Sequence, residues 1–291
     1  MKKQLFLIYL LILGVTVYSQ SHYQIQFNEL IGEGRYEEGL VLLKEWEKAE
    51  PNDIEMLIGY GNYYCNVNRQ ENPSMGRNPE DGKYYAAYLH VIWDVDDIHK
   101  AVSYLDEALT LAPYRLDIYL GKNYMLDLIH DTDLMTESIL KMLNTQKEDQ
   151  PNWLWTNNKP LSSIGRTVED VLVSSVKDRL QYMNRNPVNN KNNIQKIIDA
   201  ELALYPDNII FLNIAGNFYD DLGNRNKAIN MYNRALEINP KDYIVMYNMG
   251  LVYEALGEKE MAKKYYQSAL DNATNSQHKE LLKKRIQGIS Q

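Results

Sequence analysis

The sequence predicts an all-α protein built from stacked helical hairpins, and two observations carry this prediction. Leu, Ala, Lys, Glu and Tyr are plentiful, whereas Gly and Pro are modest at 15 and 9 of 291 residues. This balance favours helices over a β-sandwich or barrel. The C-terminal part of the chain also repeats itself at a spacing of 34 residues. A repeat of that length fits two antiparallel helices, which bury their apolar side only by stacking on neighbours.

Seven positions coincide at this spacing. The matched pairs are Gly216 and Gly250, Tyr219 and Tyr253, Gly223 and Gly257, Ala228 and Ala262, Tyr232 and Tyr266, Ala235 and Ala269, and Leu236 and Leu270. The small residues stand where neighbouring helix backbones approach each other, and the Tyr residues fill the space between helices. Gly223 permits the positive φ that ends a first helix, and Pro240 stops the second.

On these residues the segment from Ile209 to Pro240 resembles a tetratricopeptide repeat. The segment from Tyr243 to Thr274 resembles the next repeat, with Thr274 in place of the closing Pro. The resemblance implies a right-handed superhelix of hairpins, with the first helix of each hairpin lining a concave groove. It also implies a non-catalytic scaffold or adaptor that binds a peptide or protein in that groove.

The first 19 residues differ from the rest of the chain and predict a secretory signal peptide. Lys2 and Lys3 precede the apolar run from Leu5 to Val17, and small residues suited to cleavage follow. The run is shorter than the roughly 20 residues of a membrane-spanning helix, so no stable membrane insertion is expected. The mature chain is expected to begin near Gln20 and to act in the bacterial cell envelope, as a periplasmic or secreted protein.

Residues 20–150 are expected to form N-terminal repeats with an insertion at 66–95. The first repeat covers about residues 20–53, and a second starts at Ile54 but reaches its second helix only at 98–113. A third repeat runs over 116–150. The residues that fit the template in the first repeat are Gly34, Tyr36, Gly39, Leu43 and Pro51.

The insertion carries Tyr84, Tyr85, Tyr88 and Trp93 at close spacing. These aromatic residues predict either a patch over the groove or, more simply, an extra helix docked on the stack. Asp94, Asp96 and Asp97 follow, but the Gly and terminal Glu of a calcium loop are absent. We therefore expect Asp96 or Asp97 to cap a helix that starts at Ile98.

Residues 151–192 predict an irregular linker followed by a long helix over 166–185. C-terminal repeats over 193–275 and a cap helix over 276–291 complete the chain. Trp153 and Trp155 lie in a linker bounded by Pro and Asn. The sequence leaves open whether they form an exposed binding anchor or a structural plug.

Projecting the repeat template predicts a row of groove-facing residues. One position of five first helices is occupied by Asn28, Asn62, Tyr124, Asn217 and Leu251, and the neighbouring positions of the C-terminal pair by Asn213, Asp220, Tyr247, Asn248 and Glu254. Because Asn offers a donor and an acceptor, a ladder of Asn could hold the backbone of an extended peptide. The alternative is that these Asn residues solvate the groove or bond between helices.

The resemblance also bears on the ligand's charge. Family members that clamp a C-terminal carboxylate combine groove Asn with Lys or Arg. Asn217 and Asn248 match the Asn positions, but Asn213 stands where a Lys is expected. Acidic C-terminal peptides are therefore not expected, and Asp220 and Glu254 indicate a neutral or basic partner.

Charge and cysteine content narrow the remaining function classes. The net charge of -8 and the pI of about 5.3 argue against a nucleic-acid surface. Cys65, the only cysteine, is expected to be a small buried residue. The alternative is a hydrolase-like enzyme with its site around Cys65, His90 and the Asp94–Asp97 acids. The five His residues are scattered, so neither a metal nor another cofactor is expected.

Overall fold

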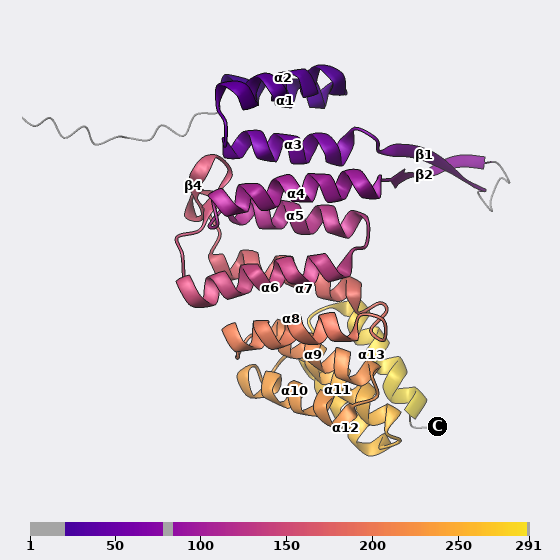
Figure 1. The fold of residues 1–291 in the computed structure, drawn as a ribbon. Coiled ribbons are helices and arrows are strands. Elements are labelled where there is room, and N and C mark those ends of the chain that lie inside the picture. The colour runs from indigo at the N-terminus through magenta and orange to yellow at the C-terminus, as the bar shows by residue number, and fades with distance from the viewer. Residues whose placement is uncertain (1–20, 78–83, 290–291) are drawn as a thin grey trace, which may run out of the picture.

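The computed structural model describes residues 21–77 and 84–289 of the chain. The predicted leader over residues 1–19 lies outside these described residues. Within them the chain forms helical hairpins that stack into one elongated body (Figure 1), so the predicted all-α solenoid is confirmed.

The hairpins follow one another along the chain, and a single helix ends it. The pairs are α1 (His22–Gly32) with α2 (Tyr36–Ala49), α3 (Ile54–Asn66) with α4 (Val95–Leu111), α5 (Leu116–Leu128) with α6 (Thr132–Asp149), α7 (Val168–Met183) with α8 (Lys191–Leu204), α9 (Ile209–Asp221) with α10 (Arg225–Ile238), and α11 (Tyr243–Ala255) with α12 (Lys259–Asn272), followed by α13 (Ser276–Ile289).

The small residues of the C-terminal repeats stand at close helix contacts, as predicted. A Cβ atom added to Gly216 would lie 2.2 Å from Cε1 of Tyr232, and the distance between the equivalent atoms of Gly250 and Tyr266 would be 2.4 Å. Gly223 has a φ of 76° at the end of its first helix. Each first helix is thus held directly against the Tyr of its own second helix.

The insertion is a β-hairpin and not a helix, so the expected helical insertion is wrong. Strand β1 (Gln70–Arg77) pairs antiparallel with β2 (Tyr84–Ile92), and the hairpin projects away from the stack (Figure 1). Aromatic and β-branched residues favour extended backbone, and Pro73 opposes a helix interior. The next helix begins at Val95, so its cap is Asp94 and not Asp96 or Asp97.

The linker after α6 packs on the stack through Trp153. This segment contains the short antiparallel pair β3 (Leu154–Trp155) and β4 (Lys159–Pro160), with 3-10 turns at 156–158 and 161–164. Trp153 is only 2% exposed, its Nε1 donates to Gln146 at 2.6 Å, and its ring meets Tyr119 edge-on. Of the two alternatives left open by the sequence, Trp153 is therefore the structural plug, and an exposed anchor at this residue is wrong. Trp155 is half-buried.

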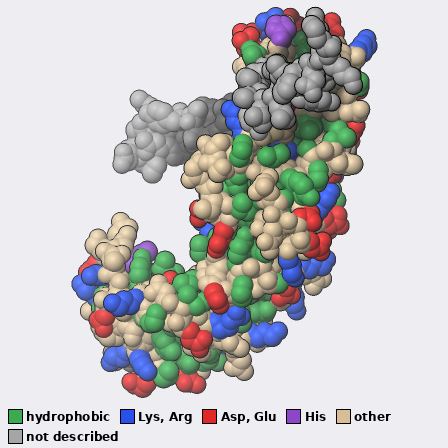
Figure 2. Space-filling model, turned by 90° about the vertical axis from the view of Figure 1, so that its left-hand side faces the viewer, with side chains coloured by type: hydrophobic (Ala, Val, Ile, Leu, Met, Phe, Trp, Pro, Cys, Tyr) green, Lys and Arg blue, Asp and Glu red, His purple; other side chains and the backbone are tan. Residues whose placement is uncertain are grey.

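The core runs along the stack and has no single centre. One cluster of buried side chains extends from Phe27 in α1 to Phe218 in α9, and two smaller clusters surround Tyr232 and Tyr266. The space-filling view shows that the body bends, with the C-terminal repeats curving to one side (Figure 2). Among the described helices, none combines the length and apolarity needed to cross a bilayer.

Candidate functional site

Four of the predicted groove residues meet around one cavity. Asn213 and Asn217 come from α9, and Tyr247 and Asn248 come from α11; they border a cavity of about 340 Å³ that α13 closes on the third side. Residues four apart share a helix face, which places the two α9 amides side by side. The structure thus brings these four residues of the template projection together at one cavity.

The Asn amides of this cavity bond between helices and still keep unused groups. Asn248 Nδ2 donates to Asn213 Oδ1 at 2.8 Å, and the Tyr232 hydroxyl donates to Asn217 Oδ1 at 2.7 Å. Within the described part of the chain, nothing engages the NH₂ groups of Asn213 and Asn217 or Oδ1 of Asn248. Two donors and one acceptor thus remain, which complements a peptide unit with its carbonyl and N–H.

The apolar wall of the cavity comes largely from the cap helix. Ile244 and Leu281 are 46% and 42% exposed, and Leu282 is buried beside them. The Tyr243 hydroxyl and His278 Nδ1 lie 2.9 Å apart and join α11 to α13. Our projection missed α13, although the signal was present: adding 34 to Tyr247 gives Leu281, so α13 occupies the place of a further first helix.

The acidic groove residues are already paired. Asp220 forms an ion pair with Arg225 at 3.5 Å. Glu254 accepts from the Tyr266 hydroxyl at 2.6 Å and pairs with Arg285 at 3.4 Å. Neither acid borders the 340 Å³ cavity, whose lining contains no Asp, Glu, Lys or Arg. His278 is therefore the only residue of this lining whose side chain can carry a positive charge.

The other projected residues do not join this cavity. Asn28 is exposed on α1, Asn62 is half-buried on α3, and Tyr124 is 51% exposed on α5. Leu251 packs against the core cluster around Tyr266. The upstream positions thus belong to a separate stretch of the stack.

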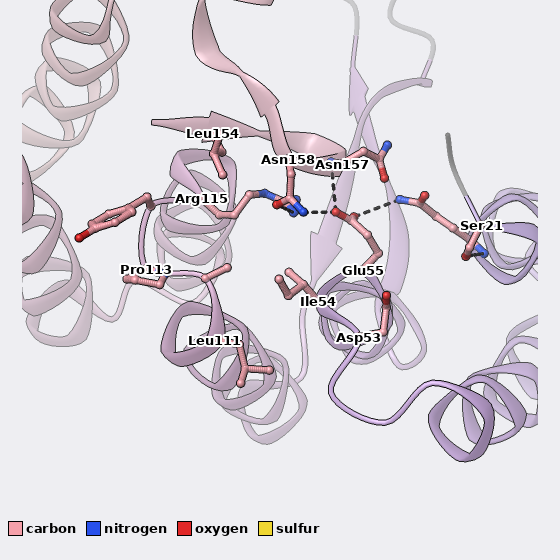
Figure 3. Close-up of a pocket in the computed structure, with 13 residues that line it drawn as sticks. Ser21, Asp53, Ile54, Glu55, Leu111, Pro113, Arg115, Leu154, Asn157 and Asn158 are labelled. Atoms are coloured by element: carbon pink, nitrogen blue, oxygen red, sulfur yellow. Dashed lines mark hydrogen bonds and ion pairs between the residues drawn. The ribbon is translucent and has the colours of Figure 1, made fainter. Parts of the chain in front are cut away.

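A second cavity, of about 720 Å³, lies at the edge of the stack where α1, α3 and α5 begin (Figure 3). The guanidinium of Arg115 borders it and is fully buried. Arg115 pairs with Glu55 at 2.7 Å and with Asp117 at 2.8 Å. We did not predict this site from the sequence, because no local pattern marks an Arg for burial.

Glu55 connects the parts of this second site. Besides Arg115, it accepts hydrogen bonds from Gln24 Nε2 at 3.0 Å and from the backbone N–H of Asn157 at 3.1 Å. Asn158 Oδ1 in turn accepts from Arg115 at 3.3 Å. A single carboxylate therefore joins α1, α3, the start of α5 and the linker.

Cys65 gives the enzyme alternative no support. Cys65 is only 7% exposed, and burial raises the pKa of its thiol to about 11, so the nucleophilic thiolate is disfavoured at neutral pH. Cys65 is thus the buried residue that we predicted. His90 belongs to β2, and its side chain is outside the described part of the structure.

Comparisons with known proteins identify the repeats. One family model, "TPR repeat", matches residues 216–257, and another, "Tetratricopeptide repeat", matches residues 243–275. No curated protein matches the chain.

Several solved structures share the stacked helical arrangement at low identity. YrrB, described as a TPR protein with an unusual peptide-binding site, is 15% identical with a TM-score of 0.44, over 83% of this chain and 97% of that one. PilW, a type IV pilus biogenesis factor, is 11% identical with a TM-score of 0.43, over 89% and 96%. A tetratricopeptide repeat protein from Parabacteroides merdae is 12% identical with a TM-score of 0.38, over 92% and 83%.

The family assignment follows from the two repeat matches, which together cover residues 216–275, and from the succession of helical hairpins described above. This chain is a tetratricopeptide-repeat protein.

Proposed function

We propose that the protein is a non-catalytic interaction scaffold that holds an extended segment of a partner polypeptide in the groove formed by α9, α11 and α13. The observation that carries this proposal is the combination of unused amide groups and an apolar wall in one cavity. The NH₂ groups of Asn213 and Asn217 and Oδ1 of Asn248 match one peptide unit of the partner. The wall of Ile244 and Leu281 receives one apolar side chain.

The charge of the cavity defines the partner segment further. Without a Lys or Arg in its lining, the cavity offers no counter-charge to a C-terminal carboxylate. An internal, uncharged segment with a bulky aliphatic or aromatic residue therefore fits it best. Specificity comes from that one side chain, because hydrogen bonds to a peptide backbone accept any sequence.

Site-specific photo-crosslinking in cells tests this proposal. A photoreactive residue replaces Ile244 or Leu281 at the cavity mouth, and crosslinked proteins are identified by mass spectrometry. The matched control replaces Ile238, the last residue of α10, which is 42% exposed but does not border the cavity. We expect both cavity positions to capture the same protein and the control position not to capture it.

The Asn248→Ala variant is then combined with the crosslinker at Leu281. Losing one peptide hydrogen bond and the bond to Asn213 should reduce the crosslink yield at least about fivefold, as expected for roughly 1 kcal/mol. Equal capture from Ile238, or an unchanged yield with Asn248→Ala, would contradict the proposal.

We also propose that the protein is exported and acts in the bacterial cell envelope or outside the cell. The support is the charged and apolar sequence of residues 1–19. N-terminal mass spectrometry of the protein from fractionated cells tests this. A chain beginning near Gln20 in the periplasm or medium is expected, whereas an uncleaved chain confined to the cytoplasm would refute export.

A further inference from the structure

The second cavity, at the start of α1, α3 and α5, lies apart from the proposed peptide groove and is built differently. Leu111, Pro113 and Ile54 form an apolar wall on one side, and the other side is polar and includes Asp53, Glu55 and Arg115 (Figure 3). Leu111 and Tyr114 are 46% and 39% exposed at the wall, with Ile54 and Pro113 beside them. Exposed apolar groups around a polar interior suit an amphipathic ligand.

Within the described part of the chain, one carboxylate of this cavity lacks a cation, and one buried amide oxygen of a lining residue lacks a hydrogen-bond donor. Gln24 is only 8% exposed, and its Oε1 is buried without a hydrogen-bond donor in the described part of the chain. Its amide orientation is fixed because Nε2 donates to Glu55 at 3.0 Å. A buried acceptor left without a donor costs free energy, so a donor supplied from outside would stabilise this arrangement.

Asp53 is the second acceptor. Its side chain caps α3 by accepting from the backbone N–H of Met56 at 2.8 Å, and it forms no ion pair with the described residues. Desolvation contributes most to the raised pKa of this half-buried carboxyl group. The Arg115 guanidinium makes the smallest contribution, which lowers that pKa. The site therefore contains a carboxylate without a cation of its own.

The guanidinium of Arg115 is already engaged by side chains of the protein itself. Arg115 uses its Nε and both terminal nitrogens on Asp117, Glu55 and Asn158. The lining of the cavity then carries two carboxylates, Asp53 and Glu55, against the single guanidinium of Arg115. An anion would meet an excess of negative charge, whereas a cation would meet the Asp53 carboxylate, which forms no ion pair with the described residues.

We propose that this cavity binds the cationic side chain of a lysine or arginine from a partner polypeptide. The alkyl stem lies along Leu111 and Pro113, and the charged end reaches the acceptors of Asp53 and Gln24. The stem covers the exposed apolar wall, and the N–H groups of the cation supply the missing donors. The net charge of -8 on the whole chain attracts such a partner over longer range.

Nuclear magnetic resonance of the ¹⁵N-labelled protein tests this proposal with three small probes. Nα-acetyl-lysine amide and Nα-acetyl-arginine amide carry the cation, and Nα-acetyl-norleucine amide is a neutral control with an apolar stem. We expect both cations to shift the side-chain amide signals of Gln24 and Asn157 saturably. The neutral probe should bind up to about fivefold more weakly, which corresponds to the upper end of the range for a part-exposed ion pair.

Asp53→Asn isolates the charge, because Asn caps a helix as well as Asp does. This variant should weaken binding of the cationic probes about fivefold. Asp94→Asn makes the same change at the cap of α4 and should leave binding unchanged, since Asp94 does not border the cavity. Leu111→Ser, at an exposed position, should weaken binding because the alkyl stem of the probe loses its apolar contact. This variant replaces Asp53→Asn in the test if Asp53→Asn does not fold.

Three results would overturn the proposal. They are the absence of saturable shifts at Gln24 and Asn157, equal affinity for the norleucine probe, and an equal loss of affinity in Asp53→Asn and Asp94→Asn. None of these outcomes depends on the peptide groove at α9 and α11, so the two sites are tested separately.

Discussion

Glu201 gives the sharpest test of the packing between the middle and C-terminal repeats. Its side chain is 0% exposed on α8, and both carboxylate oxygens lack hydrogen-bond partners within the described residues. Burial, and to a smaller extent Glu169, raises the pKa of Glu201 from 4.5 to about 8. The folded protein therefore holds this proton more tightly than the unfolded chain does.

The sign of the resulting pH dependence follows from linkage. Below pH 4.5 Glu201 is protonated in both states and imposes no ionisation cost. Between pH 4.5 and 8 the unfolded chain releases the proton first, so stability falls as the pH rises. The full shift corresponds to about 5 kcal/mol above pH 8, and to about 3 kcal/mol at pH 7.

Glu201→Gln removes the ionisation and keeps the shape of the side chain. We expect the variant to exceed the wild-type stability by only about 1 kcal/mol at pH 5 and by about 3–5 kcal/mol at pH 9. Urea unfolding followed by circular dichroism at pH 5, 7 and 9 measures the difference. Glu237→Gln, at an exposed position of α10, is the control and should leave the pH profile unchanged.

Identical pH slopes for the wild type and Glu201→Gln would refute this reasoning. That result would mean that the carboxyl group gains a partner or water in solution and ionises normally. A variant that is less stable than the wild type at every pH would refute it as well, since it would show that the carboxylate contributes to folding.

Three further predictions concern packing and burial. Gly216→Ala should destabilise the protein by about 1–3 kcal/mol in thermal unfolding, because the new Cβ would meet the Tyr232 ring, whereas Gly288→Ala, in open space on α13, should not destabilise it. Arg115→Met should cost about 3–5 kcal/mol and make the linker over 151–164 sensitive to limited proteolysis, because two part-buried carboxylates lose their cation; an unchanged cleavage pattern would contradict this role. Cys65 should resist alkylation by iodoacetamide at pH 7.5 in the folded protein and react fully in denaturant, as mass spectrometry would show; rapid labelling of the folded chain would contradict its burial.

The repeat architecture could be predicted from the sequence because its constraints are local and recur in phase. Gly216 and Gly250 are small where a Tyr ring touches the backbone, and Gly223 takes a positive φ that other residues rarely adopt. Each requirement restricts one position to one residue type. The same spacing placed Asn213 and Tyr247 at one cavity and could also have placed Leu281 there.

The conformation of the insertion over residues 66–95 could not be predicted from the sequence in the same way. Closely spaced Tyr residues suit the face of a helix as well as a strand, and no repeat of the segment elsewhere in the chain decides between them. The antiparallel pairing of β1 and β2 settles the conformation, because hydrogen bonds between strands depend on two segments at once. Trp153 is similar: its burial depends on Gln146 and Tyr119, which belong to other elements.

The sequence alone determined that helical hairpins stack and where the C-terminal groove lies. Each of these features requires a particular residue type at a fixed spacing, so it can be recognised in the sequence. Only the tertiary structure decided that Arg115 is buried against Glu55, 60 residues away, and that Asn157, 102 residues from Glu55, closes the same site. The burial of Glu201, whose carboxylate accepts no hydrogen bond from the described residues, was decided in the same way. The physical reason is that the free energy of a charged or polar group depends on its surroundings, which form only when distant segments pack together.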